Sequence, residues 1–552
     1  MRQQVEQSLN ADPDPSTRRE LIDLAENDPI SVGAIFDGRI QFGTAGLRAP
    51  MGPGPTRMNR LVVRQTTAGV MRWLGTQTSP KVVIGFDARH RSKDFARDVA
   101  ETVIAMGGLA ELFEQAQPTP VLALAVLERG ADAGVMITAS HNPAADNGYK
   151  LYLRDGIQLV SPSDSEIAAE IDQVVAEGGA VVTSGGLTGV THIGAEASDA
   201  HLQAAVGALQ TDHRDVQVLY TAMHGVGGKQ LVSAFESAGF AAPQVVAEQF
   251  NPDPDFPTVS FPNPEEHGAL DLAFSQAQHS DVDVVLANDP DADRLAVAVP
   301  DTNGVWHRLT GDQVGILLAD HLLASTRGEN RLVASSIVSS TMIEAMALDA
   351  GVESVRSLTG FKWVARPIVS FGDKQYIFGY EEALGYCVGD KVRDKDGISA
   401  ALVVAEIVAA AKAAGETLWT LLDRLYQRHG VYLTEPVTLN FTGPDSMASR
   451  EHIMRRIVSD PPHRLGSIEV SSHENLAQGR SLPPTQGVLW SLVDGSRVVV
   501  RPSGTEPKLK AYLEVVMPVE ATDPGALARA KDAADQRMVE LRAAVSDLLG
   551  GS

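Results

Sequence analysis

Short apolar runs alternate with amphipathic stretches along most of this chain, and that alternation restricts the folds it can adopt. Residues 82–86 read VVIGF, and in the following residues 91–106 apolar side chains recur at helical spacing. The same order of an apolar run and then a helical stretch recurs at 216–221 and 229–238 and at 332–338 and 342–350. Strands that alternate with helices predict parallel or mixed sheets with helices on both faces.

The last part of the chain has a different pattern. Strands are expected near residues 437–441, 497–500 and 509–516, and an alanine-rich helix is expected to start at Pro524. Those elements predict an α+β domain, and a chain of 552 residues is long enough for about three or four domains. We therefore expect three α/β domains and one α+β domain, over residues 1–206, 207–311, 312–434 and 435–552.

The charge balance and the cysteine count exclude several classes of protein. Asp and Glu number 70 against 46 Lys and Arg, and the net charge of −24 argues against a nucleic-acid partner. Small anionic substrates are not excluded, because they respond to the local field of a binding site. The single cysteine, Cys387, leaves no internal disulfide and no cysteine-based zinc site. Without an apolar signal core or a membrane-length apolar run, we expect no membrane partner and a cytoplasmic location.

The sequence TASHNP at residues 138–143 follows the apolar run 133–137, which is expected to form a buried strand. The Asn-Pro pair predicts a turn, so Ser140 is expected on a loop at the end of that strand. A serine hydroxyl beside the imidazole of His141 can act as a nucleophile or carry a phosphoryl group. A hydrogen-bonded serine turn without chemistry is the alternative at this point.

A second motif places three carboxylates on one short loop. Asp289, Asp291 and Asp293 follow an apolar run at a spacing of two residues, and such carboxylates can converge on one hard cation such as Mg²⁺. A calcium-binding EF-hand is excluded, because Arg294 stands at the glycine position of that loop and Pro300 at its final glutamate. A solvated acidic turn is the alternative, but carboxylates at strand ends of α/β folds lie where ligands bind.

Two further loops carry groups that can bind phosphate or sugar hydroxyls. Residues 501–508, RPSGTEPK, combine a guanidinium, two hydroxyls and a glycine that lets backbone N–H groups approach an anion. A polar turn between two strands is the alternative there. Residues 379–385, GYEEALG, contain Glu381 and Glu382, and paired carboxylates can accept hydrogen bonds from vicinal sugar hydroxyls.

In this order and spacing, the four motifs resemble those of the α-D-phosphohexomutase superfamily, the phosphoglucomutases and phosphomannomutases, over essentially the whole chain. The resemblance implies four domains around one central cleft, with one loop from each domain. It also implies a phosphohexomutase that interconverts sugar 1-phosphates and 6-phosphates through a phosphoserine and a sugar 1,6-bisphosphate, which also primes the enzyme. The expected partners are small sugar phosphates, and the protein itself is expected to be a monomer or a homodimer.

The resemblance assigns roles to particular residues. Ser140 is implied to carry the phosphoryl group, and Lys150 matches a lysine implicated in proton transfer. Arg48, in GTAGLR at residues 43–48, matches an arginine that approaches phosphate, and His141 neighbours Lys150 in the family's site. The implied ligands of one Mg²⁺ per active site are Asp289, Asp291, Asp293 and the phosphate on Ser140. The residues implied to bind the substrate are Arg294, Thr359, Gly360, Lys362, Glu381, Glu382, Arg501, Ser503, Gly504 and Thr505.

Two positions depart from the family's usual pattern. Ala45 stands where the N-terminal motif commonly has Ser, and Ala383 stands where the sugar loop of hexose mutases commonly has Ser. Both variants resemble a subgroup that includes phosphopentomutases, so a phosphopentomutase acting on ribose or deoxyribose phosphates is an alternative function. A phosphosugar-binding protein that has lost catalysis is another alternative. The aspartate motif also resembles haloacid-dehalogenase phosphotransferases, which use an aspartyl phosphate, but Asp293 replaces the Thr or Val expected there.

Overall fold

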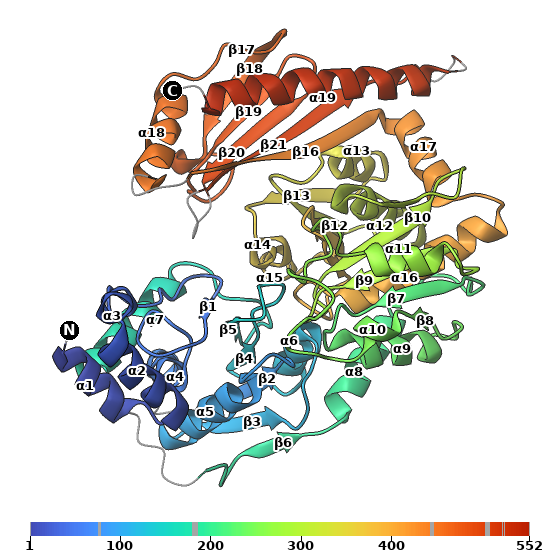
Figure 1. The fold of residues 1–552 in the computed structure, drawn as a ribbon. Helices are drawn as coiled ribbons and strands as arrows, with labels where there is room; N and C mark the ends of the chain where they lie inside the picture. The colour runs from blue at the N-terminus through green and yellow to red at the C-terminus, as the bar shows by residue number, and fades with distance from the viewer. Residues whose placement is uncertain are drawn as a thin grey trace. The chain divides into compact units, whose positions relative to one another are not determined.

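Two compact units make up this computed structural model, and Figure 1 labels their helices and strands. The structure describes residues 2–75, 79–178, 186–441, 446–502, 508–520, 523 and 525–550. The first unit consists of Met1–Leu309, Ile368–Phe371 and Ala383–Ala410. The second consists of Thr310–Pro367, Gly372–Glu382 and Ala411–Ser552.

A mixed sheet forms the first part of the first unit. Its strands are β1 (Leu47–Pro50), β2 (Lys81–Phe86), β3 (Leu109–Phe113), β4 (Ala133–Ile137), β5 (Asp146–Leu153) and β6 (Thr191–Ile193). They lie in the order β1-β5-β4-β2-β3-β6, with β5 and β1 antiparallel at one edge and the others parallel. Val82 and Ile84 enter one hydrophobic cluster and Val83 the other, because successive side chains of a strand point to opposite faces.

Helices cover both faces of this sheet, as the alternation predicts. One hydrophobic cluster takes residues from α4 (Arg60–Leu74), α5 (Ser92–Ala105) and α7 (Ser163–Ala176). The other takes residues from α6 (Thr119–Glu128) and α8 (Glu196–Val206). The helix expected over residues 91–106 is confirmed as α5, which is one residue shorter at each end.

Three helices near the start of the chain were not predicted. They are α1 (Arg2–Ala11), α2 (Pro15–Asn27) and α3 (Pro29–Ile35). Asp14 accepts a hydrogen bond from the backbone of Ser16 at 2.8 Å, and Asp28 accepts one from the backbone of Ser31 at 3.1 Å. An aspartate cap followed by proline is a favourable helix start, so these Asp-Pro pairs were usable local signals.

The second sheet of the first unit carries the aspartate motif. Its strands are β7 (Val218–Thr221), β8 (Gln244–Val245), β9 (Val284–Asn288), β10 (Leu295–Pro300) and β11 (Trp306–Arg308). They lie in the order β11-β10-β9-β7-β8, with β7, β8 and β9 parallel and β10 and β11 antiparallel to their neighbours. The helices that follow these strands are α9 (Gly227–Ser237), α10 (Ala247–Phe250) and α11 (Asp271–Ala277).

The second unit begins with a parallel arrangement. Its strands β12 (Arg331–Ser336), β13 (Glu353–Ser357) and β14 (Gln375–Glu381) pair in parallel, with β12 in the middle. The expected strand at 332–338 and helix at 342–350 are confirmed as β12 and α13, with shifted ends. The accompanying helices are α12 (Gly311–Ser325), α13 (Met342–Asp349), α14 (Phe361–Ala365) and α17 (Leu418–His429), whereas α15 (Pro367–Ser370) belongs to the first unit except for Pro367.

An antiparallel sheet covered by a long helix forms the end of the second unit (Figure 1). Its strands are β16 (Val431–Asn440), β17 (Arg464–Leu465), β18 (Ile468–Asn475), β19 (Val488–Leu492), β20 (Arg497–Pro502) and β21 (Lys508–Met517). Its helices are α18 (Ser446–Ser459), the single-turn η2 (Leu476–Gln478) and α19 (Ala526–Gly550). The expected α+β character is confirmed, and β17, β18, β19 and α18 were not predicted. Pro524, where α19 was expected to start, lies outside the described residues.

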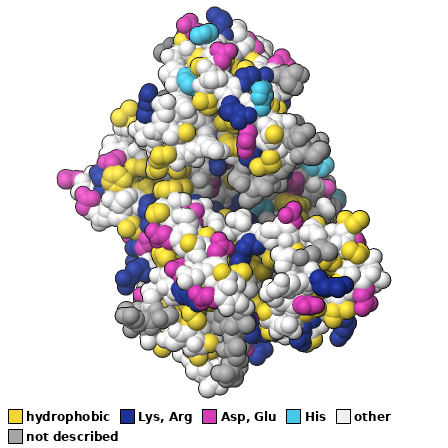
Figure 2. Space-filling model, turned by 90° about the vertical axis from the view of Figure 1, so that its left-hand side faces the viewer, with side chains coloured by type: hydrophobic (Ala, Val, Ile, Leu, Met, Phe, Trp, Pro, Cys, Tyr) yellow, Lys and Arg dark blue, Asp and Glu magenta, His cyan; other side chains and the backbone are white. Residues whose placement is uncertain are grey.

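Charged side chains of both signs are scattered over the face of the molecule that Figure 2 shows, with apolar side chains between them. Among the described residues, no helix by itself is long and apolar enough to cross a bilayer. Within the same residues, α16 (Gly397–Ala413) and α17 reach that length and composition as a pair, and the chain bends sharply between them.

Candidate active site

Ser140 lies on the loop between β4 and β5, as the sequence predicts. Its backbone is in the left-handed region, with φ of 53°, and its amide donates to Thr138 Oγ1 at 2.9 Å. Ser140 Oγ lies 3.1 Å from His141 Nδ1 and donates to Asp289 Oδ2 at 3.0 Å. The buried hydroxyl is therefore held between an imidazole and a carboxylate.

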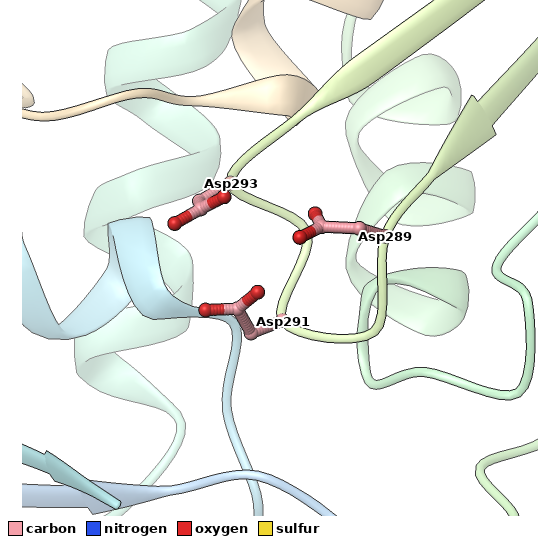
Figure 3. A group of neighbouring side chains, drawn as sticks. All are labelled: Asp289, Asp291 and Asp293. Carbon is pink, nitrogen blue, oxygen red and sulfur yellow. The ribbon is translucent and has the colours of Figure 1, made fainter. Parts of the chain in front are cut away.

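The three aspartates of the second motif lie together on the loop between β9 and β10 (Figure 3). Their carboxylate ligand atoms lie within 4.8 Å of one another, and all three residues are buried. Ala292, in the middle of the loop, has φ of 55°, and the backbone N–H of Arg294 donates to Asp289 Oδ1 at 3.0 Å. β4 and β9 both belong to the parallel parts of their sheets, and ligands of α/β sheets bind at the carboxyl ends of such strands.

Two lysines bring positive charge to this acidic cluster. Lys150 Nζ lies 2.6 Å from Asp291 Oδ2 and 2.9 Å from Asp293 Oδ2, and Lys395 Nζ lies 3.2 Å from Asp293 Oδ2. Burial disfavours the charged ammonium, but the two carboxylates outweigh burial and raise the pKa of Lys150. Both lysines therefore offset the repulsion between the carboxylates.

Lys395 was not predicted as a site residue. It precedes α16, in the segment that follows β15 (Gly385–Val388), far along the chain from the aspartate motif. Asp394 Oδ1 accepts from the backbone N–H of Lys395 at 2.8 Å, and its Oδ2 accepts from Tyr152 Oη at 2.5 Å. The one local signal is the alternating run DKD at 394–396, and such a run is also typical of a solvated loop.

Some carboxylate oxygens of the cluster are not paired with a lysine, and these oxygens are suitable ligands for a hard cation. Asp291 Oδ1 and Asp293 Oδ1 are buried and accept no hydrogen bond from any described residue. Burial and the charges of Asp291 and Asp293 raise the pKa of Asp289 well above its usual range. Burial acts in the same direction on the other two carboxyls, but the nearby lysines hold the pKa values of Asp291 and Asp293 below their usual range. Oxygen atoms of buried carboxylates are the ligands that Mg²⁺ and Ca²⁺ take, and a bound cation would satisfy them.

Three further predicted residues surround the serine. Burial, with the positive charges of Arg294 and Arg48, holds the pKa of His141 well below its usual range, so the imidazole is neutral. Arg48 lies on β1 opposite Gly148 of β5, and its Nε is buried without a hydrogen-bond partner among the described residues. Arg294 lies 3.5 Å from Glu265. The first unit thus brings Ser140 and these three side chains to one place.

The predicted sugar-binding residues lie in the second unit. Glu381 Oε1 accepts from the backbone N–H of Gly360 at 2.8 Å, so these two predicted residues are neighbours. Glu382 Oε2 accepts from the hydroxyls of Ser336 and Ser339, each at 3.1 Å. Sequence analysis did not single out these two serines, because a serine at the end of a strand has no distinctive pattern.

The remaining predicted residues are partly outside the described chain. Thr359 Oγ1 is buried without a hydrogen-bond partner among the described residues, and Lys362 lies in the first turn of α14. Arg501 pairs with Lys510 across β20 and β21. The phosphate-loop residues that lie outside the described part of the chain are Ser503, Gly504 and Thr505.

Glu382 is expected to make the stability of the protein depend on pH. Burial and the negative charges of Glu381 and Asp312 raise the pKa of Glu382 to about 8. An unfolded glutamate ionises near pH 4.5, so above that pH the folded protein holds this proton more tightly than the unfolded chain does. Stability should therefore fall as pH rises from about 4.5 to about 8, with a slope of at most about 1.4 kcal/mol per pH unit, and be level above that window.

Melting curves of the wild type and Glu382→Gln, recorded from about pH 5 to about pH 9, measure this effect, since the amide cannot ionise. The melting temperature of the wild type should decrease relative to that of the variant as pH rises through the window. A difference that stays constant with pH would contradict the raised pKa.

The sheets and the candidate site together indicate the class of protein to which the chain belongs. Three α/β sheet regions are followed by an antiparallel C-terminal sheet, and a serine hydroxyl lies beside a buried carboxylate cluster that could hold a metal ion. The chain belongs to the phosphoglucomutase/phosphomannomutase family. Models of the family's α/β/α domains I, II and III match residues 39–177, 199–304 and 310–429, and the model of its C-terminal domain matches residues 471–535.

Individual relatives agree with this membership. The chain is 40% identical to a Haemophilus influenzae protein named "Probable phosphomannomutase", over 83% of this chain and 93% of the relative. It is 35% identical to a phosphopentomutase of Pongo abelii, over 91% of this chain and 89% of the relative. A solved structure of a phosphoglucomutase/phosphomannomutase family protein from Burkholderia thailandensis has the same fold, with a TM-score of 0.67 at 19% identity, covering 93% of this chain and 98% of that one. The protein is therefore an isomerase of the mutase type.

Proposed function

We propose that this protein is a phosphohexomutase that interconverts the 1-phosphates and 6-phosphates of glucose and mannose. The observation that carries the proposal is the position of Ser140, whose hydroxyl donates to Asp289 at 3.0 Å beside three buried carboxylates. A serine in that position can carry a phosphoryl group next to a bound cation. The family membership and the relative named phosphomannomutase support this function.

In the proposed cycle, the bond between phosphorus and Ser140 Oγ breaks as phosphorus bonds to the free hydroxyl of a sugar monophosphate. The resulting 1,6-bisphosphate reorients, and its other phosphate returns to Ser140, so a trace of bisphosphate primes the enzyme. Mg²⁺, held by Asp289, Asp291, Asp293 and the phosphate on Ser140, would offset the charge on the transferring group.

The side chains around Ser140 supply the rest of the chemistry in this proposal. Because the pKa of His141 lies well below its usual range, its neutral imidazole can accept the proton of the attacking hydroxyl. Lys150 keeps its positive charge and can stabilise the transferring phosphoryl group or return the proton. Arg48 and Arg294 add positive charge where phosphate oxygens become negative.

The residues of the second unit are proposed to hold the sugar and its non-reacting phosphate. Glu381 and Glu382 can accept hydrogen bonds from ring hydroxyls, and Thr359 has a buried hydroxyl without a partner among the described residues. Gly360 directly follows Thr359, and Lys362 is the second residue of α14. Arg501, Ser503, Gly504 and Thr505 are proposed to bind the non-reacting phosphate through a guanidinium, hydroxyls and backbone N–H groups.

A phosphopentomutase is the second candidate function. Ala45 and Ala383 lack the hydroxyls common in hexose mutases, and a relative that is 35% identical over 91% of this chain is named a phosphopentomutase. A binding site without one of these hydroxyls discriminates less against sugars that have no group to bond with that hydroxyl. We therefore propose broad specificity, with hexose phosphates preferred.

The decisive experiment compares kcat/KM for glucose 1-phosphate, mannose 1-phosphate, ribose 1-phosphate and deoxyribose 1-phosphate, with glucose 1,6-bisphosphate as primer. We expect the hexose phosphates to have the higher values. A pentose preference of about 100-fold, which corresponds to about 2.7 kcal/mol of transition-state binding, would replace the hexose assignment with the pentose one. Absence of turnover with all four would favour a binding protein without catalysis.

Three properties of the whole protein belong to the same proposal. We place it in the cytoplasm, because the proposed substrates are small sugar phosphates, and we propose that it is a monomer or a homodimer. The domain limits proposed from sequence, at residues 206, 311 and 434, remain predictions. Limited proteolysis near those positions, followed by mass spectrometry of the fragments, would test them.

A further inference from the structure

A single arginine is attached to the loop that carries Ser140. Arg89 follows β2, and its guanidinium donates to three backbone carbonyl groups of the loop between β4 and β5 and to that of Asp146, the first residue of β5. One nitrogen donates to Ser140 O at 2.6 Å and Asn142 O at 2.5 Å, and the other to Pro143 O at 2.7 Å and Asp146 O at 3.2 Å. Arg89 is 4% exposed, so these bonds are protected from water.

The arginine is itself held from two sides. Asp87 lies 3.4 Å from its Nε and accepts from its backbone N–H at 3.0 Å, which anchors it to the end of β2. Phe256 lies over the guanidinium, with 4.9 Å between Cζ and the ring centroid. Phe256 belongs to the second sheet region, in the segment between α10 and α11, so Arg89 lies between the serine loop and that segment.

The loop needs such a support because its conformation is not favoured by its own residues. Ser140 has φ of 53°, and a non-glycine residue in the left-handed region costs roughly 1–2 kcal/mol. Carbonyl groups that turn inward on a buried loop must also be paired. A planar guanidinium satisfies several such carbonyl groups at fixed angles, which an ammonium group cannot do.

We propose that Arg89 is a positioning residue for the phosphoserine reaction: its guanidinium holds Ser140 Oγ at the distance from Asp289 that phosphoryl transfer requires. Phe256 assists by covering the guanidinium and keeping water from the carbonyl groups. The inference rests on the proposed phosphoserine mechanism. It predicts that weakening the support slows the transfer of phosphate to and from Ser140 without changing the affinity for sugar phosphate.

The test measures the rate at which glucose 1,6-bisphosphate phosphorylates the full-length protein, by rapid quench and intact-mass spectrometry, together with kcat and KM. For Arg89→Lys we expect the phosphorylation rate and kcat to fall about 100-fold, because a displacement of about 1 Å at a reacting group can cost that much. KM should stay within about threefold of the wild type, since Arg89 does not touch substrate in this proposal.

Arg214→Lys is the matched control. Arg214 also donates to backbone carbonyls, those of Ala238 and His213, each at 2.8 Å, and its Cζ lies 4.8 Å from the ring centroid of Phe240. Among the described residues it has no hydrogen bond to the serine loop, so Arg214→Lys should lower the melting temperature and leave the phosphorylation rate of folded protein unchanged.

Phe256→Leu keeps Arg89 and decides the question if Arg89→Lys fails to fold. We expect it to lower kcat about tenfold at unchanged KM, because a looser support displaces the serine less. If the wild type and both folded variants are phosphorylated at the same rate, the positioning role is wrong. If Arg89→Lys does not fold, phosphorylation of Phe256→Leu at the wild-type rate is enough to show that the role is wrong. If the wild type takes up no phosphate from bisphosphate, the proposed function is wrong and this inference falls with it.

Discussion

Ser140→Ala should abolish both the uptake of phosphate and turnover. The variant lacks the Oγ that lies 3.1 Å from His141 Nδ1 and 3.0 Å from Asp289 Oδ2, and a methyl group cannot bond to phosphorus in its place. Loss of a catalytic serine elsewhere costs about 10⁶-fold in kcat, and we expect a loss of at least about 10⁴-fold here. The fold should stand, because replacing a hydroxyl by hydrogen removes at most two hydrogen bonds, each worth about 1 kcal/mol.

Intact-mass spectrometry after incubation with glucose 1,6-bisphosphate measures the first effect, and a coupled mutase assay measures the second. Ser198→Ala is the control, since Ser198 lies on α8 and its hydroxyl donates to Gln117 at 2.9 Å, away from the aspartate cluster. Phosphate retained on Ser140→Ala, or phosphate that hydroxylamine removes from the wild type, would point to an acyl phosphate on an aspartate. Either result would replace the phosphoserine mechanism.

Asp291→Asn should reduce Mg²⁺-dependent turnover by about 10²- to 10³-fold, the range typical for losing one stabilising group of a preorganised site. The amide keeps the shape of the side chain but removes one of three negative charges that would hold the cation. Asp291 also pairs with Lys150 at 2.6 Å and accepts from Thr119 Oγ1 at 2.7 Å, so its loss disturbs the protein without metal. In the variant, Lys150 keeps its ion pair with Asp293 at 2.9 Å, so its buried charge is not left unpaired. We therefore expect the variant to fold, with a lower melting temperature.

Titration calorimetry with Mg²⁺ should show weaker binding to Asp291→Asn than to the wild type, and chelation by EDTA should abolish turnover of the wild type. Asp281→Asn is a suitable control, because Asp281 is an exposed acid just before β9 and has no part in the cluster. Full turnover of Asp291→Asn, or of the wild type in EDTA, would show that the three aspartates do not act through a metal.

Much of the fold is encoded locally and could be predicted. β4 was expected at residues 133–137 and is found there, and β9 ends directly before the three aspartates. The periodicity of apolar side chains is a property of each segment alone, so a strand or a helix is visible without its neighbours. The helices α2 and α3 were missed although their Asp-Pro starts are equally local. β18 was missed for a different reason, because its sequence IEVSSHEN is polar and alternates weakly.

The chemistry-bearing motifs were likewise visible in the sequence, because turn residues and paired carboxylates follow strand ends at short spacing. What the sequence by itself determined is therefore the elements with a clear apolar period, the loops that hold Ser140 and the aspartates, and the family. Tertiary structure alone decided that Lys395 meets Asp293 at 3.2 Å and that Arg89 supports the serine loop beneath Phe256. These contacts join segments far apart in the chain, and their distances depend on strand order and loop paths, which no local pattern of residues specifies.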